Sequence, residues 1–572
     1  MPAAKPIRNR SSCRAPATGL EARLAELQRS VVALEAAQAE RDEKLESALY
    51  ELTAATALAG LTGAQASQRR HYFSTLARIR EIVRERLPRA AVLAVASKGH
   101  DEMLRLHGRT GWHFPQNREG HYAGYYPSNS LSAIVQLEAL RSRGAQYFLL
   151  PDFALWWLER YGDFARHLAS RYELVVRDEA CAIYDLTALR AAPVLDSAIA
   201  DCRERLGREP AVLDWTAKAD LAARLPGSTV FSPAVKAGPL PYLDATIDIV
   251  VLGARGSSAK EARRVASGAV LKSGGDSATA EIVWRAEAAG AALPTVSIII
   301  PCHNGVALTD ACLRSLVETL PASFRGEIIV VDDASTDGTA DALRTWAAAD
   351  PRVKSLRNPK NRGFLETANR GAEAATGDFL VFLNNDLVLL PGWLPPLLRT
   401  FRDFPKAGGV GGKLIFPDGT LQEAGGMIFR DGSAAHFGRG DHELDALLYN
   451  FVRPADYCSA ALFATPRALF AKLGGFDRAY VPAYYEDTDY CCAVRAAGRR
   501  IYYQPESAAI HVEGASCGTD LTKGAKRHQQ INQARFAKKW SKLLRKLPAR
   551  PEHADTAAWQ ALALGGAGKA DA

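Results

Sequence analysis

The chain has 572 residues, which is too long for one ordinary domain and suggests about three or four. Apolar residues make up 48% and charged residues 23%, which excludes a largely disordered protein. The net charge of +8 is modest for this size, so it suits an anionic ligand or membrane surface without by itself indicating nucleic acid.

The nine cysteines form no C-x-x-C pair, which favours a reduced protein without a structural zinc. No apolar run approaches the ~18 residues that span a bilayer. The basic first residues lead into no apolar core of the kind found in signal peptides. We therefore expect a cytoplasmic protein, with a peripheral position on the inner face of a membrane as the alternative.

The N-terminal segment predicts a coiled coil. Residues 1–18 are rich in Pro, Ala, Ser and Arg and are expected to be disordered. Over residues 19–60 the two heptad core positions take Leu20, Leu27, Leu34, Arg41 and Ala48, and Leu24, Val31, Gln38, Leu45 and Leu52. This pattern favours a homo-oligomer that associates through residues 20–52. The alternative is an amphipathic helix that packs on its own protein.

Residues 70–190 predict a small α/β accessory domain. We expect helices over 71–86 and 131–142, and strands over 90–96 and 145–151. An aromatic, Gly-rich loop over 112–126 carries two histidines. Ordinary loop packing is favoured there over a pocket, because no second polar motif accompanies it.

Residues 191–290 predict a second α/β accessory unit that resembles a degenerate methyltransferase-like domain. The segment over 240–252 and a helix expected from Glu261 carry this resemblance. Asp214 is followed by Trp215, so the Gly-rich loop that such a fold needs for close approach to a nucleoside is missing. A structural or partner-binding role is therefore favoured over small-molecule binding.

Polar side chains follow two apolar strands expected over 296–300 and 328–331. They are Pro301, His303 and Asn304 after the first strand, and Asp332 and Asp333 after the second. Right-handed crossovers place these strand ends side by side. The carboxylates can accept hydrogen bonds from a pyrimidine base and ribose hydroxyls, and the histidine ring offers a surface for stacking.

Two further segments are expected at the same edge. Asn361 and Gly363 belong to a turn that reaches over it, where Arg362 could meet a phosphate. A third strand, over 379–383, ends in Asn384, Asn385 and Asp386. Hard divalent cations take oxygen ligands, and magnesium commonly bridges a carboxylate to a diphosphate.

Five segments in this order, VSIIIPCHN, VVDDASTDGT, NRGF, FLNND and YYEDTDY, make residues 293–520 resemble the inverting nucleotide-sugar glycosyltransferases of family two. The resemblance implies an α/β GT-A (nucleotide-diphospho-sugar transferase) Rossmann-like domain, preceded by the coiled coil and the two smaller α/β domains. The NND form is similar to rhamnosyltransferase-like and galactofuranosyltransferase-like members.

The resemblance also implies roles. Asp487 would be the general base, and Glu486 would orient the acceptor. Asp386 and His511 would hold Mg²⁺ or Mn²⁺. The nucleotide sugar would be bound by Pro301, His303, Asn304, Asp332, Asp333, Asn361, Gly363, Asn384 and Asn385. Asp489 is expected to cap the helix that follows the base. The replacement of the first metal-site Asp by Asn384 departs from the family pattern.

The C-terminal segment is basic. Residues 521–548 predict an amphipathic helix, and the stretch 523–550 is rich in Lys and Arg with no Asp or Glu. Contact with an anionic membrane surface and packing on the catalytic domain are both open. Residues 549–572 are expected to form a disordered tail.

These observations predict a metal-dependent glycosyltransferase. It would move a sugar from a UDP- or dTDP-sugar to a saccharide, lipid-linked or protein-linked glycan acceptor with inversion, in cell-surface polysaccharide or glycoconjugate synthesis, without a nucleic-acid partner. A nucleotidyltransferase is disfavoured because PCHNG offers no basic residue to a triphosphate. A non-catalytic scaffold is the other alternative.

Overall fold

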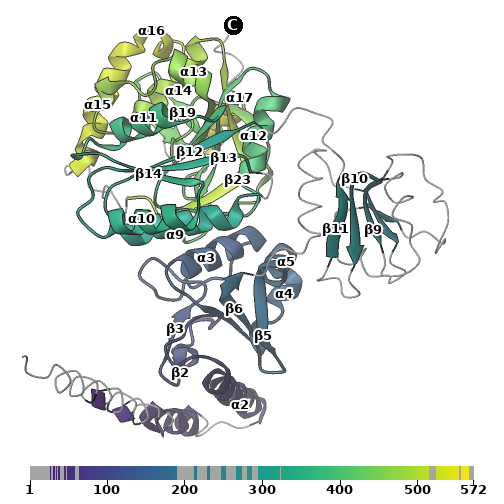
Figure 1. The fold of residues 1–572 in the computed structure, drawn as a ribbon. Coiled ribbons are helices and arrows are strands. Elements are labelled where there is room, and N and C mark those ends of the chain that lie inside the picture. Colours follow the sequence, from purple (N-terminus) through teal and green to yellow (C-terminus); the bar gives the residue numbers. More distant parts are fainter. Residues whose placement is uncertain are drawn as a thin grey trace, which may run out of the picture.

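The computed structural model describes residues 63–189, 294–321, 324–514, 524–552 and 556–565, scattered helical residues between 26 and 57, and the backbone of five strands between 211 and 285. The predictions for residues 1–18 and for a helix beginning at Glu261 lie outside these residues. Figure 1 shows the described residues from 294 onward as the largest body, with the accessory domain of residues 63–189 against one side of it.

The domain of residues 63–189 is a six-stranded mixed sheet with helices. Its strand order is β2-β3-β1-β4-β6-β5, and β1 pairs parallel to both β3 and β4. In chain order its elements are α2 (Gly63–Arg86), β1 (Val92–Val95), η1 (Asp101–Leu104), β2 (Arg105–Leu106), β3 (Arg109–His113), α3 (Ser130–Ser142), β4 (Tyr147–Pro151), η2 (Asp152–Ala154), α4 (Trp157–Arg160), α5 (Gly162–Arg171), β5 (Tyr172–Arg177) and β6 (Cys181–Leu189).

The helix before α2 both packs on its own protein and exposes heptad positions. The phenol of Tyr50 donates to the Phe73 carbonyl at 2.5 Å, and Glu46 accepts from the backbone N–H of His107. Leu34 and Leu45 are nevertheless 71% and 70% exposed. The single chain therefore leaves part of the predicted coiled-coil seam uncovered, and self-association stays a prediction.

A second sheet lies between residues 211 and 285, with strand order β11-β10-β9-β7-β8. Its strands are β7 (Ala211–Trp215), β8 (Thr229–Phe231), β9 (Ile247–Leu252), β10 (Ala266–Ser273) and β11 (Ala280–Arg285). All of its neighbours pair parallel except β10 and β11. The second α/β unit therefore contains a sheet, and its resemblance to a methyltransferase stays a prediction.

The C-terminal body is built on a ten-stranded mixed sheet. Its main path is β14-β13-β12-β15-β22-β17-β23-β16, with β18 and β21 pairing onto its side. The first half carries the parallel strands β12 (Val296–Cys302), β13 (Gly326–Asp332), β14 (Val353–Arg357) and β15 (Phe379–Leu383). The second half carries β16 (Leu387–Leu389), β17 (Ala407–Ile415), β18 (Leu421–Glu423), β21 (Arg453–Ala455), β22 (Leu462–Pro466) and β23 (Arg500–His511).

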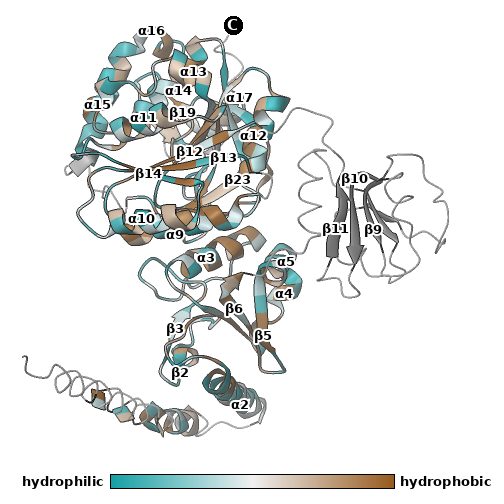
Figure 2. Ribbon diagram, viewed as in Figure 1, coloured by the Kyte–Doolittle hydropathy of each residue, from teal (hydrophilic) through white to brown (hydrophobic). Residues whose placement is uncertain are grey.

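Strands β12 and β17 are buried at every residue, because helices cover both faces of this sheet. Figure 2 shows the strands as mostly hydrophobic and the outward sides of the helices as hydrophilic. One face packs against α9 (Val306–Thr319) and α12 (Leu394–Asp403), and the other against α11 (Phe364–Ala374), α13 (Arg467–Lys472), α14 (Glu486–Ala496) and α15 (His528–Lys539). The remaining elements are α10 (Thr339–Ala349), the hairpin β19 (Gly426–Ile428) and β20 (Ala434–His436), η3 (Leu447–Tyr449), η4 (Arg478–Tyr480), η5 (Gly524–Arg527), α16 (Ser541–Leu544) and α17 (Thr556–Gly565).

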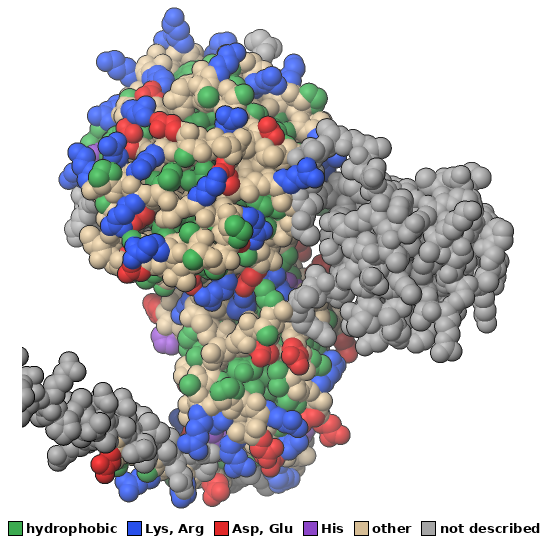
Figure 3. All heavy atoms as spheres, in the orientation of Figure 1, with side chains coloured by type: hydrophobic (Ala, Val, Ile, Leu, Met, Phe, Trp, Pro, Cys, Tyr) green, Lys and Arg blue, Asp and Glu red, His purple; other side chains and the backbone are tan. Residues whose placement is uncertain are grey.

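The predicted basic helix is α15 together with the short α16, and it packs on the C-terminal body. Phe536 and Leu544 are buried in the larger hydrophobic core. Figure 3 shows Lys and Arg side chains over the region where these helices lie in Figure 1, so the outer surface there is basic. The structure thus agrees with the packing alternative, and membrane contact stays a prediction.

The predicted disordered tail contains a helix, α17. Trp559 packs edge-on against Phe429 at 5.5 Å between ring centroids, and Ala563 is buried. This helix forms where the composition predicted disorder, because its apolar side chains are buried against the C-terminal body.

Candidate active site

A cavity of about 1000 Å³ lies beyond the carboxyl ends of β12 and β15 and beneath the β19–β20 hairpin. Its wall includes the predicted residues Pro301, Asn384, Asn385, Asp386, Glu486, Asp487 and His511. The sheet brings these side chains together because the NND segment follows β15, β23 runs in the same direction as β15 and ends at His511, and α14 begins at Glu486.

One end of the cavity is a possible cation site. The Nε2 of His511 lies 3.2 Å from Asp386 Oδ1 and 3.3 Å from the side-chain amide of Asn384. Nδ1 of His511 lies 2.9 Å from Gln422 Oε1, an acceptor, so the proton is assigned to Nδ1. The unprotonated Nε2 then faces Asp386 and is free to bind a cation. A carboxylate and a correctly oriented imidazole fit a divalent cation. The described residues hold no group of three His, Cys, Asp or Glu side chains able to bind a metal, so a diphosphate or water would complete the coordination.

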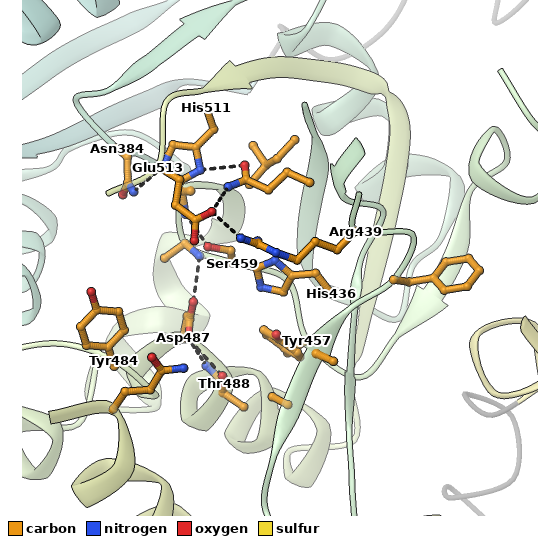
Figure 4. Close-up of a pocket in the computed structure, with 18 of the residues that line it drawn as sticks. Asn384, His436, Arg439, Tyr457, Ser459, Tyr484, Asp487, Thr488, His511 and Glu513 are labelled. Carbon is orange, nitrogen blue, oxygen red and sulfur yellow. Dashed lines mark hydrogen bonds and ion pairs between the residues drawn. The ribbon is translucent and has the colours of Figure 1, made fainter. Parts of the chain in front are cut away.

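The predicted base lies on the floor of the cavity (Figure 4). Asp487 accepts hydrogen bonds from the backbone N–H of Ala460 at 3.2 Å and of Thr488 at 2.6 Å. Burial nevertheless raises the pKa of Asp487, although its place at the start of α14 favours the carboxylate. A raised pKa makes a carboxylate a stronger base toward a hydroxyl.

Glu486, the neighbour of the base, is also buried. Burial, and then the charge of Asp487, raise the pKa of Glu486 well above its ordinary value. Its Oε2 has no hydrogen-bond partner among the described residues although it lies at the cavity wall. A protonated Glu486 could therefore donate to a ligand hydroxyl.

Two strained residues precede the base. Tyr484 and Tyr485 have φ values of 75° and 73°, which non-glycine residues rarely adopt. The side-chain amide of Asn532, on α15, donates to the carbonyls of Tyr480, Ala483 and Tyr484 at 2.8–3.0 Å. Helix α15 thereby holds the turn that positions Asp487.

Asp489 does not cap α14, contrary to the prediction. It lies inside the helix, 3% exposed, and accepts from the indole N–H of Trp540 at 2.7 Å and from Lys539 at 2.8 Å. The residue at the cap position is Tyr485. Asp489 thus ties the C-terminal helices to the catalytic body.

The sequence analysis assigned no role to the buried Glu423 or the partly exposed His436, which form a pair beside the predicted base. Glu423 Oε2 lies 3.5 Å from Nδ1 of His436, and neither atom has a hydrogen-bond partner among the described residues. Burial raises the pKa of Glu423 to about 8, with the charge of Asp487 adding to the shift. Burial lowers the pKa of His436 to about 4. At neutral pH the pair is thus largely neutral.

A polar chain, also missed in the sequence, links the hairpin loop to the possible cation site. Arg439 pairs with Glu513 at 2.6 Å, and Gln422 donates to Glu513 at 3.0 Å while also contacting His511 (Figure 4). Burial raises the pKa of Glu513, but the hydrogen bond and charge of Arg439 outweigh it and hold this pKa below its usual value. Two sequence segments, QEAGG and HFGRG, contain Gln422 and Arg439 and could have indicated this chain. They lie far from the acidic motifs along the sequence.

The remaining predicted nucleoside residues, His303, Asn304, Asp332, Asp333, Asn361 and Gly363, lie at the same sheet edge but not in the cavity wall. Asp332 is 1% exposed, pairs with Arg357 and accepts from Ser335. These contacts occupy its carboxylate within the protein.

The neighbouring Asp333 accepts backbone N–H groups of Arg362 and Gly363, so it fixes the predicted turn. The Asp333 carbonyl also contacts Nδ1 of His303 at 2.8 Å. Direct contact of these residues with a nucleoside stays a prediction.

Among the described residues, no helix is both long enough and apolar enough to cross a membrane.

Part of this chain is similar to known proteins. Residues 297–463 match the model of Glycosyl transferase family 2. The chain is 33% identical over 236 residues to the O-antigen biosynthesis protein RfbC of Myxococcus xanthus, covering 40% of this chain and 18% of the relative. It is 30% identical over 237 residues to the uncharacterized protein y4gI of Sinorhizobium fredii, covering 40% and 26%. The chain thus spans about a quarter or less of these relatives' lengths.

Two solved structures are also similar. GalNAc-T7 with UDP, GalNAc and Mn²⁺ aligns with a TM-score of 0.38 and 17% identity, covering 44% of this chain and 50% of that one. The mannosyltransferase PcManGT from Pyrobaculum calidifontis, in complex with GDP-Man and Mn²⁺, aligns with a TM-score of 0.30 and 22% identity, covering 39% and 59%.

The strand order and the family match together confirm the predicted α/β fold. Residues 297–463 are similar to Glycosyl transferase family 2, and they contain the parallel strands and part of the antiparallel half of the ten-stranded sheet.

Proposed function

We propose that this protein transfers a glycosyl group from a UDP- or dTDP-sugar to a hydroxyl of a saccharide or glycan acceptor, with inversion at the anomeric carbon. The observation that carries the proposal is the shared cavity. Asp386, Asp487 and His511 come from three separate elements, yet all line it. One carboxylate–imidazole corner and one buried carboxylate are the two groups that such a displacement needs.

In the proposed reaction, Asp487 takes the proton of the acceptor hydroxyl while that oxygen forms its bond to the anomeric carbon. The bond from that carbon to the nucleoside diphosphate breaks in the same step, and the diphosphate leaves with the bonding electron pair. Glu486 would hold the acceptor by donating a hydrogen bond, and Ala460 and Thr488 keep Asp487 oriented.

Asp386 and His511 would hold the Mg²⁺ or Mn²⁺, and the bound cation would neutralise the diphosphate. Asn384 replaces a charged ligand, but its amide lies against His511 and could turn its oxygen toward the cation. Pro301 and Asn385 line the cavity nearest the strands, and we place the nucleotide between them and the turn of Asn361 and Gly363.

By analogy with the O-antigen biosynthesis relative, we place the protein in cell-surface polysaccharide or glycoconjugate synthesis.

The exposed heptad leucines support a homo-oligomer. Sedimentation equilibrium would test it: Leu34→Asp with Leu45→Asp should lower the mass toward the monomer, and an unchanged mass would contradict it.

A thermal-shift panel of nucleotide sugars, with and without Mn²⁺, tests the proposed donor and cation. UDP- or dTDP-sugars should raise the Tm only with the cation, and Asp386→Asn should remove the shift. Asp386→Asn is preferable to Asp332→Ala, since Asp332 pairs with Arg357 and its loss would disturb the sheet edge itself. A cation-independent shift, or none with any nucleotide sugar, would contradict the proposal.

A further inference from the structure

We infer that an aromatic surface on the accessory domain binds the saccharide acceptor beyond its reacting end. The surface consists of Tyr125, Tyr126 and Trp156, which we call the aromatic platform. This inference rests on the proposed function and deepens it, since it gives the first accessory domain a role in holding the acceptor chain.

The platform is exposed although its residues are large and aromatic. Tyr125, Tyr126 and Trp156 are 41%, 43% and 39% exposed. In the described part of the accessory domain, the other exposed large hydrophobic side chain is Leu174, on β5. Tyr126 and Trp156 are in ring contact, and Tyr125 is the neighbour of Tyr126 in the chain, so these exposed rings are not scattered singly over the domain.

Contacts with neighbouring residues hold the Tyr126 ring and the loop of the two tyrosines in place. Tyr126 packs edge-on against both Trp156 and the buried Trp157, at centroid distances of 5.7 and 5.9 Å. The phenol of Tyr161 donates to the Pro127 carbonyl at 2.8 Å and anchors the loop that carries the two tyrosines. Ligand binding would therefore require little further ordering of these side chains.

The platform is continuous with the rim of the cavity. The ring of Tyr125 packs edge-on against His442 at 5.9 Å, and Ser128 donates to the His442 carbonyl at 2.9 Å. The residue before His442 is Asp441, which lines the cavity. A chain leaving the cavity over this rim would meet the platform next.

A second contact joins the same two regions. Arg118, from the loop that carries Tyr125, and Arg439, from the cavity wall, both lie over the ring of Phe416, at 5.1 and 4.9 Å. Arg118 also lies 3.7 Å from Asp418. The loop is thus fastened to the catalytic body on the side where the cavity opens.

A saccharide fits this surface chemically. A pyranose ring offers an apolar C–H face to an aromatic ring and hydroxyls to polar groups at its edge. Tyrosine and tryptophan combine a rigid apolar face with a polar handle. Lys98, which lies 5.7 Å from the centre of the Tyr126 ring, donates to the Phe153 carbonyl and has further N–H groups that can donate to sugar hydroxyls. The rings and this donor together suit a hydroxyl-rich chain.

The test uses the full chain with cellohexaose, chitohexaose and maltohexaose and their disaccharides as soluble probes, after screening on a glycan array. Binding is followed by tryptophan fluorescence and calorimetry. At least one hexasaccharide should bind at least tenfold more tightly than its disaccharide. The double variant Tyr125→Ala/Tyr126→Ala, and separately Trp156→Ala, should weaken it at least tenfold.

Two controls separate loss of the rings from loss of the fold. Tyr125→Phe/Tyr126→Phe keeps the rings and should retain binding, and Leu174→Ala removes an equally exposed apolar side chain elsewhere on the domain. Equal affinity in the alanine variants and the wild type, or no oligosaccharide bound on the array, would overturn the inference.

Nucleotide release from the donor, measured in the same variants, should stay at the wild-type rate, because the platform lies outside the cavity. Release without platform-dependent glycan binding would refute the platform alone. Platform-dependent binding without release from any nucleotide sugar would refute the proposed function alone.

Discussion

At the residue scale, the proposed chemistry depends on buried carboxyl groups. Asp487, Glu486 and Glu423 all lie in or beside one cavity, and burial raises the pKa of each. Carboxyl groups with shifted pKa values are common at functional sites, because catalysis often requires a pKa different from the one the group has in water. This clustering sets the cavity apart from the ordinary ion pairs elsewhere on the sheet.

The buried Glu423 predicts a pH dependence of stability. Its pKa rises from an ordinary 4.5 to about 8 on folding, so between these values the folded state binds more protons than the unfolded state. The stability therefore falls as the pH rises through this window, by up to about 1.4 kcal/mol per pH unit. His436, with its pKa lowered to about 4, contributes the opposite slope only between about pH 4 and 6.5.

Between pH 6.5 and 8 only the Glu423 contribution remains of this pair. Thermal melts of wild type and Glu423→Gln over this range should differ, with a flatter Tm profile and a higher Tm at pH 8 in the variant. Parallel profiles would mean that Glu423 ionises normally. Glu443→Gln, an exposed carboxyl change on a nearby loop, is the matched control and should leave the profile unchanged.

At the scale of the element, helix α15 supports the base from outside the family-matched segment. Asn532 is fully buried, and its amide spans three carbonyls of the turn before α14. That turn holds the two consecutive positive-φ tyrosines, so it depends on external support.

Asn532→Ala should therefore lower both stability and turnover. Loss of a buried donor leaves carbonyls without partners, at a cost of about 1–3 kcal/mol. Misplacing Asp487 should lower kcat more than it changes donor KM. Ile531→Ala, next to it and 47% exposed, is the control and should be close to wild type in melting temperature and kcat. An Asn532→Ala enzyme with wild-type kcat would refute the supporting role.

The sequence predicts the elements well where apolar runs end in polar residues. Strands β12, β13 and β15 fall near their expected positions, because buried parallel strands are continuous apolar runs. The resemblance to the family, rather than the strand pattern, predicts that Asp386, Asp487 and His511 lie near one another.

What could not be predicted depends on contacts distant in sequence. Asp489 stands where a helix-capping acid is common, but its partners Lys539 and Trp540 come from α15 and its end. The pairing of Glu423 with His436 arises from the folding of β18 and β20 over the cavity. Helix α17 owes its order to Trp559 against Phe429, which composition does not reveal.

At the scale of the whole molecule, a largely buried ionic network joins the accessory domain to the C-terminal body. Arg141 on α3 donates to Glu318 on α9 at 2.6 Å, and Arg171 donates to the same carboxylate at 3.0 Å. Glu138, fully buried beside them, pairs with Arg141 and His167 and accepts from Tyr172. Figure 1 shows α3 directly against α9, which fixes the accessory domain beside the cavity rim.

Arg141→Met should loosen this docking. Removing one partner of a buried ion pair leaves charge uncompensated and costs about 3–5 kcal/mol. Calorimetry should show a lower melting transition, and limited proteolysis should cut faster between the domains. Arg314→Met, which breaks an exposed pair with Asp310 on the same helix α9, should change neither. Equal behaviour of the two variants would show that the network does not hold the domains together.

The central claim is that Asp487 acts as the base for a sugar leaving a nucleoside diphosphate bound beside Asp386. Its most direct test is the rate of nucleotide release and of glycan product formation, with a nucleotide sugar found by the thermal-shift panel, Mn²⁺ and an acceptor glycan. Asp487→Asn should lower kcat by about 10²–10⁴-fold with little change in donor affinity, because only the proton acceptor is lost. Wild-type turnover in Asp487→Asn would contradict the account.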